Sequence, residues 1–225
     1  MTTKNHKYID IILVSFVSML LISNLAATKL ISFGSIITDG GAVLFPLIYI
    51  FNDVITEVYG YKYARRAIWL GFLMMILAVL AFTLVRYLPS APYYTSQDAY
   101  VKVLGFFPRI VLASLCAYLI GSFVNSIILA KMKVITKGKK LWARLVGSTI
   151  IGEFLDTLVF GVVAFAGILT LSDLVKFIMI GWIFKTMVEV LLLPVTYRVI
   201  NYIKKSENVD FYDKKTDFNP VHLNL

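Results

Sequence analysis

Residues 145–160 read LVGSTIIGEFLDTLVF, an apolar stretch that contains two acidic residues, Glu153 and Asp156. It lies inside a longer apolar run, and about 20 such residues suffice for a helix to cross the roughly 30 Å hydrocarbon core of a bilayer. Because residues three and four apart share one side of a helix, both carboxylates point the same way as Thr149 and Phe160. The stretch therefore predicts a membrane-spanning helix that turns an acidic face toward other helices. Ion pairs that only join helices would give the same pattern.

The composition extends this prediction to the whole chain. Of 225 residues, 59% are hydrophobic and 16% are charged, whereas soluble domains carry about 25% charged residues. We predict an all-α integral membrane protein with one transmembrane domain over residues 1–205, followed by a polar, loosely ordered tail over residues 206–225. Six transmembrane helices are expected, the first of them retained rather than cleaved, at residues 8–28, 41–58, 67–88, 109–130, 143–169 and 174–203.

The basic residues alternate between the two sides of this predicted domain. Most of the 22 basic residues lie before the first helix, between the second and third, between the fourth and fifth, or after the sixth. Cytoplasmic loops of membrane proteins are enriched in Lys and Arg, so both termini are predicted to be cytoplasmic. The net charge of +9 thus reflects topology, and nucleic acid is not an expected partner.

The second predicted helix is the least regular, because Gly40, Gly41 and Pro46 interrupt its start. Broken helices in transporters often lie beside a binding site. A loop followed by a shorter helix explains the same residues, and both interpretations stay open.

The six helices also suggest two halves of three helices each. Asn24 near the end of the first helix corresponds to Asn125 in the fourth, and Asp53 and Glu57 of the second correspond to the acidic pair of the fifth. Because three is odd, such halves would be inverted in the membrane, a plan common among transporters. Amides also join helices in lipid, and for Asn125 a packing role is favoured because small residues precede it at intervals of four.

The sixth predicted helix carries Lys185 and Glu189, one turn apart. An ionisable group at the bilayer centre costs roughly 2.5–3.5 kcal/mol on insertion scales, so it needs a partner or a role. Lys185 could neutralise Glu189 on its own helix or Asp156 across the bundle. Either pair could be purely structural.

Asp53 and Glu57 lie one turn apart toward the inner end of the second helix, with Tyr49 a turn earlier. They could line a gate or a binding site. They could equally form a solvated charge cluster at the membrane surface with the basic residues at 62–66.

Acidic residues outnumber basic ones within the predicted helices. Lys185 stands against the acids Asp53, Glu57, Glu153, Asp156 and Glu189. Such an excess is too costly for a dry bundle, so protonation, water or a bound cation must relieve it. We therefore expect a polar cavity that is open to solvent.

Several catalytic classes do not fit the composition. His6 and His222 lie in the terminal segments, which removes a helix-borne HExxH zinc site and a Ser/His protease. Cys116 is the only cysteine, so neither a disulfide nor a thiolate metal site is expected. An aspartyl enzyme needs two carboxylates that share a proton, which the nearby lysine opposes. We expect no enzymatic activity, no cofactor and no metal.

One motif resembles a known family. Residues 45–60 read FPLIYIFNDVITEVYG and are followed by Ala64-Arg65-Arg66, which is similar to the signature of the queuosine precursor transporters, also called vitamin uptake transporters. The agreement spans the six predicted helices in order and continues in Ser23-Asn24, residues 109–121, Gly152, Asp156-Thr157, Lys185 and Pro194.

The resemblance implies uptake of a modified guanine base across a bacterial inner membrane for tRNA modification. The base would be 7-cyano- or 7-aminomethyl-7-deazaguanine, or queuine. The implied fold is similar to the substrate-binding subunits of energy-coupling-factor vitamin transporters, and the alternative function is that of a binding subunit in such an energy-coupled complex. The expected partners are the small deazapurine and the lipid bilayer, and homo-oligomerisation is left open.

The chemistry of the implied base matches residues that the helix pattern alone singles out. A guanine edge presents two parallel N–H donors, which a carboxylate of Asp156 or Glu153 can accept. Asn24 and Lys185 can meet the carbonyl oxygen. An aromatic ring can stack on the base, at roughly 1–3 kcal/mol per base. The ring candidates are Phe160, Trp182 and Tyr49, and the remaining neighbours in the predicted substrate site are Glu189, Asp53 and Glu57.

Overall fold

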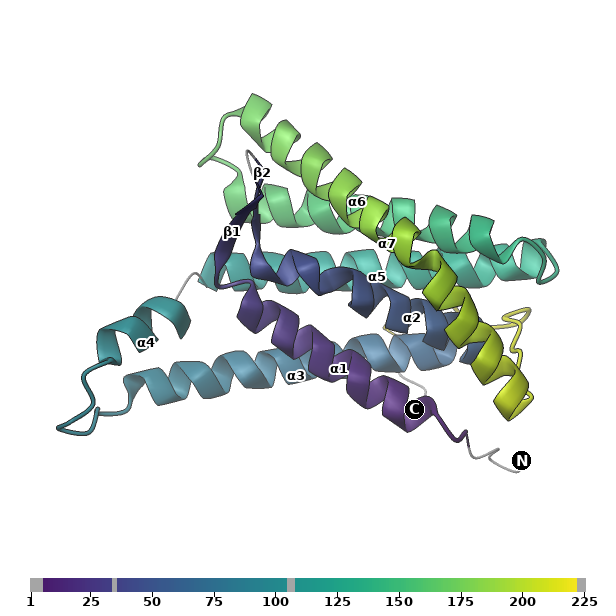
Figure 1. Cartoon of the computed structure of the whole chain (residues 1–225), viewed down its shortest axis with the longest axis horizontal. Coiled ribbons are helices and arrows are strands. Elements are labelled where there is room, and N and C mark those ends of the chain that lie inside the picture. Colours follow the sequence, from purple (N-terminus) through teal and green to yellow (C-terminus); the bar gives the residue numbers. More distant parts are fainter. Residues whose placement is uncertain (1–5, 34–35, 105–107, 222–225) are drawn as a thin grey trace.

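The computed structural model describes residues 6–33, 36–104 and 108–221. The regular secondary structure within these ranges is helical apart from one antiparallel hairpin (Figure 1). The helices are α1 (Ile9–Ala26), α2 (Phe45–Tyr59), α3 (Tyr61–Tyr87), α4 (Gln97–Leu104), α5 (Pro108–Ile135), α6 (Leu141–Phe165) and α7 (Leu171–Glu207). The hairpin pairs β1 (Leu30–Phe33) with β2 (Ile36–Asp39), and a 3-10 helix, η1, covers Gly40–Val43. The predicted helical architecture is confirmed.

Five helices in the described ranges are long and apolar enough to cross a membrane, namely α1, α3, α5, α6 and α7. At 1.5 Å per residue, the 37 residues of α7 extend for about 55 Å, well beyond the hydrocarbon thickness. The 15 residues of α2 extend for only about 22 Å. The predicted second spanning helix thus corresponds to a helix that is too short to cross the bilayer by itself.

The segment before α2 explains why this helix is short. After α1 the chain forms the hairpin and then η1, and Gly40 folds back onto the end of α1. The Gly40 N–H donates to the Lys29 carbonyl at 2.8 Å, and a β-carbon at Gly40 would lie 2.6 Å from the Ala26 carbonyl oxygen. Of the two interpretations of this segment, a loop followed by a shorter helix is the one that the structure supports.

The short α2 lies in the middle of the bundle (Figure 1). It packs against α1, α3, α5 and α7, and its residues from Ile48 to its end at Tyr59 are buried except for Phe51. This helix is enclosed although it carries the polar residues Asn52, Asp53, Thr56 and Glu57. The acids of α2 are therefore carried into the interior rather than to the surface.

Close contact between α5 and α6 depends on two glycines. A β-carbon at Gly152 would lie 2.7 Å from the β-carbon of Asn125 and 3.1 Å from the Gly121 carbonyl oxygen. A β-carbon at Gly121 would lie 2.6 Å from the Tyr49 hydroxyl. Small residues allow helix backbones to approach closely in membranes, and here they also bring α2 against the α5–α6 pair.

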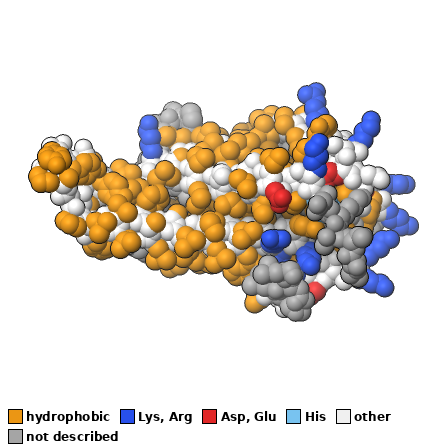
Figure 2. Space-filling view, turned by 90° about the horizontal axis from the view of Figure 1, so that it is seen from below, with side chains coloured by type: hydrophobic (Ala, Val, Ile, Leu, Met, Phe, Trp, Pro, Cys, Tyr) orange, Lys and Arg blue, Asp and Glu red, His pale blue; other side chains and the backbone are white. Residues whose placement is uncertain are grey.

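The outer surface has a long apolar girdle and one basic end. Large apolar side chains are exposed along the spanning helices, for example Leu84 at 66% and Leu191 at 71%. Figure 2 shows apolar side chains along the length of the molecule and Lys and Arg gathered at the end where α1 begins and α7 ends. This distribution suits a protein whose sides face lipid and whose ends face water.

Residues 208–221 are packed against this basic end, in contrast to the loosely ordered tail that we expected. The Phe211 N–H donates to the Val58 carbonyl at 3.2 Å, and the Asp213 carboxylate accepts from the Tyr61 N–H at 3.1 Å. Trp69 donates to the Pro220 carbonyl at 2.8 Å. The first N–H groups of a helix lack partners within it, and the segment supplies an acceptor at the start of α3. Gly60 permits the close fit, because it adopts a φ of 90° and faces the Phe211 ring.

Candidate functional site

Polar and charged side chains from α2, α5, α6 and α7 meet inside the bundle. We call this group the central polar cluster, and its members are Tyr49, Asp53, Asn125, Thr149, Glu153, Asp156, Thr157, Lys185 and Glu189. Its acids are almost completely buried, with exposed fractions from 0% for Glu153 to 4% for Glu189. The cluster brings together most of the acids that the sequence places in the substrate site.

Lys185 pairs with Asp156 across the α6–α7 interface. The Lys185 ammonium lies 2.8 Å from the Asp156 carboxylate and 4.4 Å from the centroid of the Phe45 ring. The Phe45 ring is in turn 5.6 Å from that of Tyr49. Of the two partners predicted for Lys185, the one across the bundle is therefore confirmed. Phe45, which we did not single out from the sequence, adds an aromatic face to the pair.

Glu189 lies among hydroxyl and carboxyl groups instead of beside Lys185. It accepts a hydrogen bond from Thr149 at 2.6 Å, and Thr186, one turn before it on α7, donates to Glu153 at 3.1 Å, which brings the two glutamates close together. Asp53 accepts from the side chain of Asn125 at 2.6 Å. Asn125 thus has a polar partner in addition to the packing role that its spacing predicts.

Several polar atoms of the central polar cluster have no hydrogen-bond partner among the described residues. They are the Tyr49 hydroxyl, Asn125 Oδ1, Glu153 Oε1, the Thr157 hydroxyl and Glu189 Oε2. A buried polar group without a partner costs about 1–3 kcal/mol, so such groups are uncommon and call for an explanation. Their concentration in one place indicates a site that receives a further polar partner.

Glu57 belongs to a second group, which we call the ionic cluster. It lies at the basic end and consists of Glu57, Lys133, Arg144, Lys204 and Asp210. Arg144 donates to both Glu57 oxygens, at 2.9 and 2.7 Å, and Lys133 and Lys204 lie within ion-pair distance of the same carboxylate. Because Glu57 is 0% exposed, the predicted solvated cluster at the membrane surface is wrong.

The actual partners of Glu57 differ from the basic residues at 62–66 for a geometric reason. Helix α5 continues to Ile135 and α7 to Glu207, past the ends predicted at residues 130 and 203. These extra turns carry Lys133 and Lys204 inward over the end of α2. In the sequence, Lys133 and Lys204 stand among other basic residues. Nothing in the sequence distinguishes these partners of Glu57 from the loop lysines that set membrane orientation.

The ionic cluster also holds the segment after α7. Lys133 and Lys204 contact the Asp210 carboxylate at 2.6 and 2.8 Å. Partial burial acts to raise the pKa of Asp210, but the hydrogen bonds from the two ammonium groups outweigh it and lower that pKa below its ordinary value. Asp210 is therefore ionised at neutral pH and helps to neutralise the cluster.

Asn24 lies at a junction of α1, α3 and α5. Its amide donates to the Leu20 carbonyl at 2.9 Å and to the Met75 sulfur at 3.4 Å, and its oxygen accepts from Ser114 at 3.0 Å. These contacts match the helix-joining role of amides in lipid. They do not include a member of the central polar cluster, and the role of Asn24 as a ligand stays a prediction.

Two of the predicted stacking rings also pack elsewhere. Phe160 contacts Phe165 and Phe177, with ring centroids 5.9 and 6.3 Å away. Trp182 lies against Phe154 at 5.3 Å and donates to a backbone carbonyl of α6. Tyr49 is the stacking candidate that does reach the cluster, together with Phe45.

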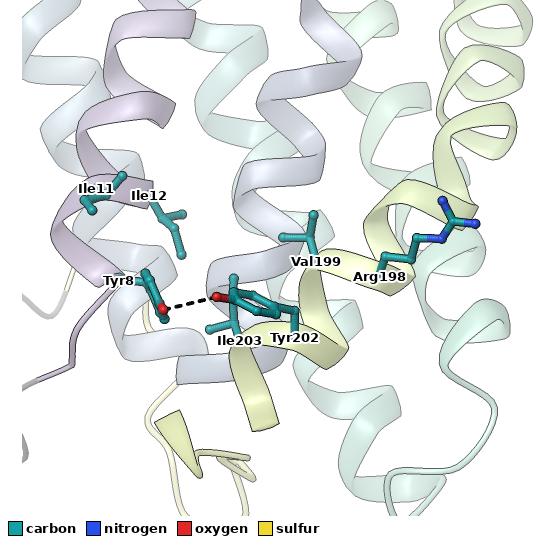
Figure 3. A pocket seen from close by; sticks show the side chains of 7 residues that line it. All are labelled: Tyr8, Ile11, Ile12, Arg198, Val199, Tyr202 and Ile203. Carbon is teal, nitrogen blue, oxygen red and sulfur yellow. Dashed lines mark hydrogen bonds between the residues drawn. The ribbon is translucent and has the colours of Figure 1, made fainter. Parts of the chain in front are cut away.

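A groove of about 350 Å³ lies outside the bundle, between the start of α1 and the end of α7 (Figure 3). Tyr8 and Tyr202 face each other across it, with their hydroxyls 3.4 Å apart. The other lining residues are Ile11, Ile12, Arg198, Val199 and Ile203. None of the predicted site residues lines this groove, and its largely aliphatic wall offers little to a polar base.

Comparison with known proteins agrees with the helical membrane architecture. The sequence profile of the family described as "putative vitamin uptake transporter" matches residues 39–199. A "probable queuosine precursor transporter" of Bacillus subtilis (strain 168) is 28% identical over 186 residues, which cover 82% of this chain and 81% of that protein. The "queuosine precursor transporter" of Escherichia coli (strain K12) is 30% identical over 132 residues, which cover 57% of this chain and 55% of that protein.

No solved structure matches the chain, so the expected likeness to energy-coupling-factor subunits stays a prediction. The family match covers most of the chain, including α2, α6 and most of α7. The chain is therefore a membrane transporter that belongs to the putative vitamin uptake transporter family, the family of the queuosine precursor transporters.

Proposed function

We propose that this protein imports a queuosine precursor, a 7-deazaguanine base, and does so without a partner ATPase. The observation that carries the proposal is the Asp156–Lys185 pair beside the Phe45 ring. A guanine-type edge offers a carbonyl oxygen next to two N–H donors. An ammonium can donate to the former and a carboxylate can accept from the latter. The pair and the ring thus supply the complementary groups at one site.

The proposed substrate site lies between α2, α6 and α7. Asp156 would accept from the N–H edge, Lys185 would donate to the carbonyl oxygen, and Phe45 and Tyr49 would contact the flat ring. Glu153 lies one turn before Asp156, and its unpartnered oxygen offers a further acceptor. The site predicted from the sequence included Asn24 of α1 and did not include Phe45. The site proposed here leaves out α1 and adds Phe45.

We also propose that the segment from β1 to α2 makes a sixth passage through the membrane. The Tyr8 N–H donates to the Glu207 carboxylate at 2.7 Å, which brings the start of α1 beside the end of α7. Five crossings would leave these two points on opposite sides. The basic side chains gathered at this end (Figure 2) support a cytoplasmic location for both termini in a bacterial inner membrane.

Uptake in a bacterial strain tests the function directly. The strain should lack both the synthesis of the precursor and its own importer, and the readout is queuosine in tRNA at nanomolar supply of 7-cyano-7-deazaguanine. Expression of this chain alone should restore queuosine. No restoration despite membrane insertion would contradict a stand-alone importer, and restoration only with an added ATPase complex would favour the binding-subunit alternative.

A matched pair of variants tests the site. Asp156→Asn should abolish uptake, because the amide cannot accept both N–H donors and leaves Lys185 without its counter-charge. Asp173→Asn is the control, since Asp173 lies in the first turn of α7 with its side chain 55% exposed. Retained uptake by Asp156→Asn would remove the central ligand from the proposal.

A further inference from the structure

Three carboxyl groups of the central polar cluster lie close together, and the proposed substrate site uses only one of them, Glu153. Thr149 on α6 donates to Glu189 on α7, and Thr186 on α7 donates to Glu153 on α6, so two hydrogen bonds cross between these acids. Asp53 on α2 accepts from Asn125, which packs against Gly152, the residue before Glu153. All three acids are buried, at 4% exposure for Glu189, 1% for Asp53 and 0% for Glu153. We call Asp53, Glu189 and Glu153 the carboxyl row.

The cations of the interior pair with acids outside this row. Lys185 lies 2.8 Å from Asp156, and Arg144, Lys133 and Lys204 surround Glu57. Among the described residues, none of the three carboxyls of the row has an ion-pair contact within 4 Å. Their nearest donors are neutral, namely Thr149 to Glu189, Thr186 to Glu153 and Asn125 to Asp53.

Buried carboxyls that lie close together need a proton among them. An ionised carboxylate only accepts hydrogen bonds, whereas a protonated one also donates. Two carboxylates that share a site cannot both ionise without strong repulsion, and an uncompensated buried charge costs several kcal/mol. The row therefore holds at least one proton, which its members can share.

The surroundings of the row support a site where protons arrive and leave. The buried Tyr49 hydroxyl has no hydrogen-bond partner among the described residues, and it lies against Gly121 together with the β-carbon of Asp156. Asn125 Oδ1 and Glu189 Oε2 are likewise unpartnered. The charged and titratable groups that face the row are Tyr49 and Glu57 from α2, Asp156 from α6 and Lys185 from α7, while α5 contributes the amide of Asn125.

We propose that the carboxyl row is a proton-binding site and that the protein is a proton symporter of its base. This inference rests on the proposed function. One proton from the outer solvent binds to a carboxylate oxygen of the row, accompanies the base and leaves to the cytoplasm, so that no bond other than O–H forms or breaks.

Lys185 provides the coupling between the base and the proton. Its ammonium pairs with Asp156 and also acts on Glu153, one helical turn away. A base that draws the ammonium toward its carbonyl oxygen weakens the positive field at Glu153, so that Glu153 binds a proton more readily. Because linkage is reciprocal, a protonated row must then favour binding of the base to the same degree.

Proteoliposomes that contain the purified full chain test the coupling. With labelled 7-cyano-7-deazaguanine outside, an imposed gradient of one pH unit, alkaline inside, should accumulate the base about tenfold for one proton per base. A pH-sensitive dye trapped inside should report acidification when the base is added. Glu189→Gln should accumulate no more base with the gradient than without it, whereas the control Asp173→Asn should follow the gradient like the wild type.

The outcomes separate the coupling from the transport itself. If the base equilibrates across the membrane and its accumulation does not depend on the pH gradient, the coupling is refuted and the proposed function is not affected. Absence of base entry under every gradient would instead contradict the proposed function. Infrared spectra of the purified protein then decide on the proton site alone: the carbonyl band of a protonated carboxylic acid should be present near neutral pH and weaken in Glu189→Gln, and its absence in the wild type would refute the site.

Discussion

The Phe45 ring lies over the ammonium group of Lys185 and so forms one wall beside the Asp156–Lys185 pair. Its centroid lies 4.4 Å from the Lys185 nitrogen, and such a contact is worth about 0.5–2 kcal/mol. Phe45 is the first residue of α2, which follows η1 closely. Among the aromatic residues near the pair, it is thus the one most directly tied to the charged groups.

Phe45→Leu should weaken recognition of the precursor about threefold to thirtyfold, because it keeps an apolar side chain but removes the ring. The measurement is the substrate concentration at half-maximal uptake. Phe160→Leu is the matched control, since Phe160 packs against Phe165 and Phe177. If Phe160→Leu had the larger effect, the base would lie nearer the α6–α7 turn than we propose.

Substitution by Gln should reduce stability much more at the buried Glu57 than at the buried Glu189. Glu57→Gln leaves three cations around a neutral side chain, and removal of one partner from a buried ion pair costs about 3–5 kcal/mol. Glu189→Gln replaces a carboxyl that shares a proton by a neutral group of similar shape, so no buried cation loses its partner and the loss of stability should be well below that of Glu57→Gln.

Thermal unfolding of the purified variants in detergent measures this difference. The melting temperature of Glu57→Gln should fall well below that of the wild type, and that of Glu189→Gln should fall much less. Equal losses in both variants would mean that Glu189 is ionised and paired in the folded protein.

Part of the site follows from the sequence at this scale, and part does not. Lys185 and Asp156 stand out because an ionisable residue within an apolar run needs a partner, and helical spacing places each on an inward face. Lys133 and Arg144 stand near basic loops, where the positive-inside rule explains them without any reference to Glu57. Phe45 is one of many aromatic residues, and only the folded chain brings it to Lys185.

At the scale of elements, the short α2 is the feature that the sequence describes least well. Its apolar length suggests a spanning helix, but residues 30–33 and 36–39 pair as strands and residues 40–43 form η1 instead. Hydropathy counts apolar residues without regard to backbone direction, so the fold-back at Gly40 has no hydropathy signal. The long helices α3, α5, α6 and α7 lie where their apolar runs predict them, with differences at the ends.

The contact between α5 and α6 gives a prediction about these elements. Gly152→Ala should destabilise the protein by about 1–3 kcal/mol, since the new methyl group meets Asn125 and the α5 backbone. Gly147→Ala on the same helix is the control, because its methyl group would meet only the flexible end of Met132 at 3.4 Å. A helical Gly→Ala change without a clash gains up to about 1 kcal/mol.

Melting temperatures of both variants, together with uptake, provide the measurement. Gly152→Ala should lower both quantities, because a shift of α5 displaces Asn125 and its partner Asp53. Gly147→Ala should lower neither. Unchanged stability in Gly152→Ala would show that α5 and α6 can move apart at little cost. That result would contradict a tightly packed site between the four helices.

At the scale of the whole molecule, the two ends differ in how tightly they are closed. At the basic end, the start of α1, the end of α2, the α5–α6 turn and the segment after α7 are tied together by Glu207, Asp213 and the ionic cluster. At the opposite end, α4 lies apart from the α6–α7 turn (Figure 1). With the cytoplasmic location that we propose for the basic end, the ionic cluster would have to loosen before the proposed substrate leaves.

Single-cysteine labelling tests the sixth passage and the orientation together. In a Cys116→Ala background, Lys29→Cys and Lys62→Cys place one thiol on each side of the segment from β1 to α2, at two exposed lysines. A membrane-impermeant maleimide should label Lys29→Cys in intact cells and Lys62→Cys only after the cells are disrupted. Tyr93→Cys, at a position that is 88% exposed, should be labelled in intact cells and serves as the outer reference.

The possible patterns of labelling lead to different structures. If Lys29→Cys and Lys62→Cys react from the same side, the segment enters and leaves the membrane on one side. The chain would then cross five times, and the contact between Tyr8 and Glu207 could not form. If the pattern is reversed, the passage exists but the basic end faces outward, and the ionic cluster would close the outer side. Only labelling of Lys29→Cys from outside and of Lys62→Cys from inside fits a base that enters past the hairpin and is released at the basic end.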